Sequence, residues 1–243
     1  MFFFRKKSIV VDCFTAISGA MKYAKPKNAA EFIPQWWKDL PKTYVDDNSF
    51  YPNPTMRSCS GFIDLYKRGI IMPAWCDISV EIGRKGTYAY RWQFSDDHYN
   101  AVFHDARQID KNFNAEEYAH IKLMSPWAFR TTNKTYFSLQ SPAWNMLYNF
   151  NYKILNGVLE FKNQPSTNVN MLFKRKNENY IENIKYKTPL VHLVPLSDKK
   201  IKLKHHLVSK SEFNSFDNPR IKFSQNYNEI KKSNCPFFKG KNK

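Results

Sequence analysis

The stretch CDISVEIGRKGTYAYRWQF, residues 76–94, decides the fold. Both of its halves alternate apolar and polar residues with a period of two, which is typical of half-buried strands. In the first half, Ile78, Val80 and Ile82 lie on one face. The sequence GRKG at 83–86 supplies a turn between the two halves. The stretch therefore predicts an antiparallel hairpin and a fold rich in β-structure.

Similar short strands recur along most of the chain. Alternating or branched apolar runs occur at residues 8–15, 120–133, 135–147, 151–161, 168–176 and 188–196. Their spacing of roughly ten residues is typical of an antiparallel β-sandwich or a barrel. We therefore predict a mainly β domain of the α+β class over residues 1–198, with its last strand at 188–196.

Helical decoration is predicted within residues 28–72. Asn28 is typical of a helix N-cap, and Pro34 limits the segment that follows to one short helix or two turns. The apolar residues between 63 and 71 have helical spacing, and Gly69 is typical of a C-cap. The fold class therefore includes short N-terminal helices beside the sheets.

Length and composition are typical of one folded domain. The 243 residues are 42% hydrophobic and 16% aromatic, which excludes a disordered chain. The four cysteines form no CxxC pair, so we predict neither a zinc ribbon nor a disulfide framework, and no cofactor. No run approaches the roughly 18 apolar residues of a membrane helix, and the N-terminus lacks the order of a signal peptide. We expect a soluble intracellular protein without membrane contacts.

The charge of the chain is strongly positive. A formal net charge of +17 favours acidic partners such as nucleic acid, although an AT-rich genome with many lysine codons is an alternative explanation. Residues 199–243 hold twelve Lys or Arg and three Asp or Glu, which predicts a basic C-terminal arm with a helix around 225–232. The candidate nucleic-acid-binding residues of this arm are Lys199, Lys200, Lys202, Lys204, Arg220, Lys222, Lys231 and Lys232.

Aromatic residues are interleaved with basic ones at several places, including YRWQF at 90–94 and RIKFSQNY at 220–227. Cations bind phosphates and rings stack on bases, so this combination suits single-stranded nucleic acid. A strand with one face in water produces the same pattern. Both interpretations stay open at this point.

One polar segment gathers residues capable of acid–base or metal chemistry. Histidines and carboxylates recur between residues 98 and 120, and the candidate metal ligands among them are His104, Asp105 and His120. A polar loop with solvated histidines is the alternative interpretation. The sequence has no GxSxG nucleophile motif and no phosphate-binding glycine loop.

Three stretches carry a family resemblance: ILNGVLEF at 154–161, NVNMLF at 168–173 and IENIKYKTPLVHLVP at 181–195. Their apolar spacing resembles the C-terminal half of the dUTPase family of β-clip proteins. The resemblance covers about 45 residues and implies a β-clip-like arrangement of strands over about 150–198.

At single positions, this sequence departs from the family pattern at most of the residues that matter for its chemistry. Glu160 stands where the family has its water-activating Asp, which makes Glu160 a candidate catalytic residue. Asn163 replaces the tyrosine that stacks on the nucleoside, and Pro165 and Lys187 replace two glycines. His192 replaces a glutamine. The resemblance therefore implies the strand geometry of the family more than its chemistry.

Most of residues 8–198 resembles a group of proteins from tailed bacteriophages, including phages of marine cyanobacteria. The phrases that carry this resemblance are VDCFT, FIPQWWKDLPK and CSGFIDLYKRGIIMPAWCDI. The resemblance implies a phage protein in the host cytoplasm or the virion. We expect a non-enzymatic structural or assembly protein that binds other phage proteins or itself, and nucleic acid through its arm. A dUTPase-like nucleotide-binding or hydrolysing protein and a host-directed interaction protein are the alternatives.

Overall fold

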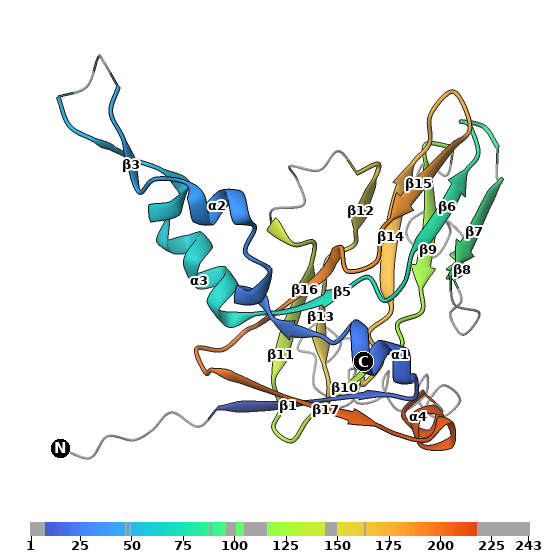
Figure 1. The fold of residues 1–243 in the computed structure, drawn as a ribbon. Coiled ribbons are helices and arrows are strands. Elements are labelled where there is room, and N and C mark those ends of the chain that lie inside the picture. Colours follow the sequence, from blue (N-terminus) through green and yellow to red (C-terminus); the bar gives the residue numbers. More distant parts are fainter. Residues whose placement is uncertain are drawn as a thin grey trace, which may run out of the picture.

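Strands dominate the computed structural model, which describes residues 8–46, 48, 50–87, 89–95, 101–104, 116–143, 150–162 and 164–217 (Figure 1). Strands account for 43% of the residues in the structure and helices for 19%. These proportions, together with several antiparallel sheets, confirm the predicted mainly β class. None of the described helices is long and apolar enough to cross a membrane.

A three-stranded sheet has the N-terminal strand at its centre. Its order is β10 (Ala128–Thr131), β1 (Ile9–Thr15) and β17 (Ile201–Leu207). β10 pairs with β1 antiparallel, and β17 pairs with β1 parallel over seven residue pairs. The predicted first strand is confirmed, whereas β17 lies beyond the segment that we predicted as the last strand.

A five-stranded antiparallel sheet passes through the middle of the molecule. Its order is β13 (Gly157–Glu160), β11 (Tyr136–Gln140), β16 (Pro189–Pro195), β5 (Ile70–Pro73) and β2 (Lys27–Asn28). The residues Ile70 and Ile71, which have helical spacing in the sequence, therefore belong to a strand. Their apolar run continues directly from a helix, and a short apolar run does not distinguish the two structures by periodicity.

The remaining strands form three smaller sheets. A four-stranded sheet has the order β12 (Tyr152–Ile154), β14 (Val169–Lys174), β9 (Tyr118–Leu123) and β8 (Ala101–Phe103). A three-stranded sheet has the order β15 (Tyr180–Ile184), β6 (Ile78–Ile82) and β7 (Tyr90–Phe94). A two-stranded sheet joins β3 (Thr43–Tyr44) to β4 (Asn53–Pro54).

The hairpin predicted from residues 76–94 is confirmed as β6 and β7. Ile78 pairs with Phe94 and Ile82 pairs with Tyr90 in antiparallel register. The buried residues alternate along β6, so the apolar face predicted from the sequence is the face that enters the core.

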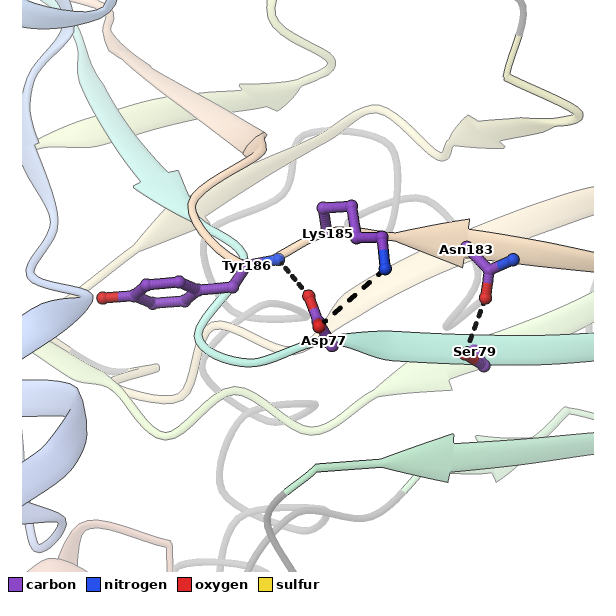
Figure 2. A network of polar contacts seen from close by, with 5 residues as sticks. All are labelled: Asp77, Ser79, Asn183, Lys185 and Tyr186. Carbon is purple, nitrogen blue, oxygen red and sulfur yellow. Dashed lines mark hydrogen bonds and ion pairs between the residues drawn. The ribbon is translucent and has the colours of Figure 1, made fainter.

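Polar contacts hold the other edge of β6 to β15 (Figure 2). Asp77 Oδ1 accepts a hydrogen bond from the backbone N–H of Tyr186 at 2.7 Å, and Ser79 Oγ donates to Asn183 Oδ1 at 2.7 Å. Lys185 Nζ lies 4.0 Å from Asp77 Oδ2. The Tyr186 hydroxyl donates to the Tyr23 carbonyl at 2.6 Å, which connects this turn to the first helix.

The helices are short and lie mainly in the first third of the described chain. They are α1 (Ser18–Tyr23), η1 (Ala29–Phe32), α2 (Gln35–Asp39), η2 (Met56–Ser58), α3 (Ser60–Arg68) and α4 (Lys210–Asp217). The prediction of short helical pieces between 28 and 72 is therefore confirmed. A small apolar cluster around Tyr66 and Ile71, with Trp37 packed against it, joins η1 and α3 to the five-stranded sheet.

Aromatic side chains from several sheets form the main core. Trp127, Phe129, Phe137, Phe161 and Phe173 are fully buried within one continuous apolar cluster. Phe161 stacks on Phe129 with ring centroids 5.1 Å apart and contacts Phe137 at 4.8 Å. Buried rings of this size dominate the hydrophobic free energy of a core.

Gly69 is the C-cap residue of α3, as predicted, but not for the predicted reason. Its φ is −104°, which any residue adopts, so no left-handed conformation requires glycine. A Cβ atom at Gly69 would lie 1.9 Å from Nε2 of His192 on β16. Glycine is required here because α3 approaches a buried side chain so closely.

Candidate nucleic-acid interface

Lysine side chains line the outward face of β17. The buried residues of β1 pair with Ile201, Leu203 and His205, so these three side chains face inward. The alternate residues Lys202 and Lys204 are exposed on the opposite face. Lys200, whose carbonyl accepts the Ile9 N–H at 2.8 Å, is the next residue of this register and is also exposed. Three lysines therefore follow one another at every second position.

An arginine from another strand extends this basic row. Arg130 on β10 and Lys204 on β17 both pair with Asp12 on β1, so the three side chains lie in one line across the sheet. Asp12 is partly buried, and its Oδ1 accepts a hydrogen bond from His206 Nε2 at 2.8 Å. The Asp12 carboxylate thus has a hydrogen-bond partner in His206. Arg130 and Lys204 are exposed on the two edge strands of the sheet.

Aromatic rings close one end of the same face. Phe14 pairs with His206 across β1 and β17, and their rings stack with centroids 4.8 Å apart. Phe216 of α4 contacts Phe14 at 4.7 Å. We call the residues Lys200, Lys202, Lys204, Arg130 and Phe14, with the His206 and Phe216 rings, the basic sheet face.

The inward face of β17 fixes the lysines in position. Ile201 and Leu203 pack against the main core. His205 Nε2 donates to the Pro26 carbonyl at 2.8 Å, and its ring meets the Trp127 ring edge-on at 5.9 Å. Burial lowers the pKa of His205, although its hydrogen bond to Pro26 acts in the opposite direction. The lysines therefore project from a strand whose other side is packed.

The predicted arm is thus divided by the structure. Of its candidate residues, Lys199 and Lys200 precede β17, and Lys202 and Lys204 are part of it. The remaining candidates, Arg220, Lys222, Lys231 and Lys232, and the helix predicted at 225–232 lie outside the described residues. The first part of the arm is therefore a strand of a sheet, because its alternate apolar residues pack on the core.

The predicted metal ligands are only partly brought together. His104 and His120 are cross-strand neighbours, with the His104 N–H donating to the His120 carbonyl at 3.0 Å and rings stacked at 4.7 Å. Burial lowers the pKa of His120 to about 4, assisted by His104 and Lys122, whereas a hydrogen bond to Asn170 raises it. Asp105 lies outside the described residues. Within the part of the chain that the structure describes, no three potential ligands gather around a metal position.

Glu160 lies at the end of an edge strand. It is half-buried on β13 and pairs with Tyr136 of β11. The pKa of Lys134 is raised by a hydrogen bond to Tyr136 and, to a smaller extent, by the charge of Glu160. The charge of Glu160 thus acts weakly on Lys134, which suits a minor electrostatic contact at the end of β13.

The structure adds three residues to the candidate interface that we did not predict from the sequence: Asp12, Phe14 and Arg130. The signal for two of them was present, because strict alternation over residues 9–15 places Asp12 and Phe14 on one face of the first strand. Their association with lysines near residue 202 depends on a parallel pairing that spans most of the chain. No local pattern reports such a pairing.

No protein-family model matches the chain, and no curated protein matches it significantly in sequence.

Proposed function

We propose that the protein binds single-stranded nucleic acid through the basic sheet face, as a non-enzymatic, phage-encoded protein with a structural or assembly role. The observation that carries the binding is the row of exposed lysines along β17, extended across the sheet by Arg130. The phage origin and the assembly role follow from the sequence resemblance alone.

The spacing of the lysines suits a single phosphate backbone. Successive outward residues of a parallel strand lie roughly 6.6 Å apart, close to the separation of neighbouring phosphates in an extended single strand. Lysine binds phosphate as a point charge, and each contact releases counterions. A row of this kind holds a strand in position without reading its sequence.

The aromatic end of the face favours single strands over duplexes. The Phe14 and Phe216 rings lie at one end of the lysine row. Aromatic side chains are the groups on which unpaired bases stack in proteins that bind single strands. Bases inside a duplex are already stacked and do not present their faces. We therefore expect weak dependence on base sequence and a preference for unpaired strands.

Removing two lysines of the row tests the proposal. The double variant Lys202→Gln/Lys204→Gln should bind a short fluorescent single-stranded oligonucleotide about 30-fold more weakly, at roughly 1 kcal/mol for each lost phosphate contact. Fluorescence anisotropy titration measures the affinity. Both side chains are exposed, so the melting temperature should stay unchanged.

The matched control is Lys38→Gln/Lys67→Gln. These lysines are exposed on α2 and α3. The control therefore lowers the net charge of +17 by two, as the test variant does. Figure 1 shows α2 far from β17, and α3 lies outside the three-stranded sheet that carries the lysine row. The control should bind like the wild-type protein. Equal affinities for all three proteins would contradict the proposal, and the β17 lysines would then serve only to prevent pairing at the sheet edge.

A further inference from the structure

The hairpin of β3 and β4 extends away from the rest of the molecule, beyond α2 and α3 (Figure 1). Its strands contain only two residues each, yet the segment carries large apolar side chains in water. Phe50 is fully exposed, Tyr51 is 80% exposed and Val45 is 77% exposed, and Tyr44 is exposed as well. We call these four residues the hairpin tip. Apolar groups gathered on a projecting element mark an interaction site more often than single scattered ones.

Hydrogen bonds at its base hold the hairpin in its projecting position. The Lys42 carbonyl accepts the Thr55 N–H at 2.9 Å and the Ser58 hydroxyl at 2.8 Å. Arg57 Nη1 donates to the Leu40 carbonyl at 2.9 Å, and the Thr55 hydroxyl donates to Pro41. The hairpin is therefore fixed at its base in a position in which its tip projects from the molecule.

The charge of the hairpin identifies the chemistry of that partner. Residues 43–54 contain two aspartates and no lysine or arginine, within a chain of net charge +17. The aromatic tip, with the exposed Asp46 next to it, is complementary to a surface that combines apolar side chains with positive charge. A second copy of this basic chain offers such a surface.

The five-stranded sheet carries an apolar patch that suits the tip. On the face that includes His192, α3 packs over β16 and β2, and this leaves the β11–β13 half of the same face open. Tyr136, Val158 and Leu196 are exposed there on neighbouring strands. We call these three residues the sheet patch. Lys134 lies over the Tyr136 ring at 5.5 Å, and Lys162 follows β13 in an exposed position. The half-buried Glu160, which pairs with Tyr136, is the carboxylate between these two lysines.

We propose that the hairpin tip of one molecule binds the sheet patch of a second copy. Because the two surfaces differ, the contact is head-to-tail, and repetition closes a ring or extends a filament. The exposed parts of the three rings and one valine of the tip offer less area than the roughly 800 Å² per partner of a standard interface. Self-association should therefore depend on protein concentration. This self-assembly surface is separate from the basic sheet face, so either proposal can fail alone.

Substitution at the tip gives the first test. In sedimentation velocity experiments over a 100-fold range of concentration, the wild-type protein should shift from monomer to larger species. Phe50→Ser/Tyr51→Ser should stay monomeric at every concentration. Ile181→Ser, which removes an apolar side chain that is 60% exposed on β15, is the control and should associate like the wild-type protein.

Mixing two variants gives the second test, because it distinguishes a head-to-tail contact from tip-to-tip pairing. Val158→Asp places a negative charge in the apolar sheet patch, opposite the tip and its neighbour Asp46, so this variant alone should also be monomeric. A mixture of Val158→Asp with Phe50→Ser/Tyr51→Ser retains one intact tip and one intact patch, and it should form a 1:1 dimer that does not grow further.

Three results would overturn this inference. They are a wild-type protein that remains monomeric throughout, association that Val158→Asp leaves unchanged, and a mixture that remains monomeric while wild-type protein assembles. Circular dichroism melting of each variant checks that it is folded. All the substituted side chains are exposed, so the melting temperatures should match that of the wild-type protein.

Discussion

The variant Gly69→Ala should be about 3 kcal/mol less stable than the wild-type protein, because its new methyl group overlaps a buried histidine. The alanine Cβ would lie 1.9 Å from Nε2 and 2.5 Å from Cδ2 of His192. His192 has no room to move, since it is fully buried on β16 with the Tyr66 ring 5.3 Å away. For a domain of this size the loss corresponds to a melting temperature roughly 6–12 °C lower.

Two further variants assign this effect to the steric overlap. Gly61→Ala lies in the same helix, where the nearest atom to the added Cβ is 3.9 Å away, and it should be neutral or slightly stabilising. In the double variant Gly69→Ala/His192→Ala, the second substitution should restore part of the lost stability by removing the overlap. Chemical denaturation of all three variants measures these differences. If Gly69→Ala were as stable as the wild-type protein, this result would contradict the close approach of Gly69 to His192.

Acid should destabilise the protein well above the pH range in which carboxylates titrate. Burial lowers the pKa of His192 to about 4, and neither ring nitrogen has a hydrogen-bond partner among the described residues. The unfolded chain takes up this proton near pH 6.5, where the folded protein remains neutral. Stability is therefore complete above pH 6.5 and falls by about 1.4 kcal/mol per pH unit for this histidine, down to pH 4. His120, with a pKa also lowered to about 4, adds a loss of the same sign.

The variant His192→Leu isolates the contribution of one histidine to this pH dependence. Leucine has a similar size but binds no proton, and it leaves no unpaired nitrogen in the core. The slope of unfolding free energy against pH between 6.5 and 4.5 should be smaller by about 1.4 kcal/mol per pH unit than in the wild-type protein. Urea denaturation at several pH values provides the slopes. Identical slopes in both proteins would exclude His192 as a source of acid sensitivity.

Local pattern was sufficient for strands whose partners are close in sequence. The hairpin of β6 and β7 is an example, because its alternation and its turn lie within nineteen consecutive residues. The stretch 154–161 shows where this reasoning ends. It contains the last residue of β12 and all of β13, but β12 pairs with β14 and β13 pairs with β11, so Leu155 and Asn156 connect two different sheets. Pairing of this kind is decided by tertiary packing.

The candidate interface shows the same division. The lysine content of residues 199–204 was visible in the sequence, and their role as candidates for nucleic-acid contact was predicted from charge alone. The alternation of Ile201 and Leu203 with these lysines was visible as well, but the high local charge favoured an arm over a strand. Burial against the core, contributed by residues far away in sequence, gives this short segment its strand structure.

The most direct test of the proposed function is the salt dependence of single-strand binding. On logarithmic axes the association constant falls linearly with salt, with a slope of about −0.7 for each phosphate neutralised. Loss of two contacts in Lys202→Gln/Lys204→Gln should make this slope shallower by about 1.4, whereas Lys38→Gln/Lys67→Gln should run parallel to the wild-type protein. A slope in Lys202→Gln/Lys204→Gln equal to that of the wild-type protein would contradict binding through the basic sheet face.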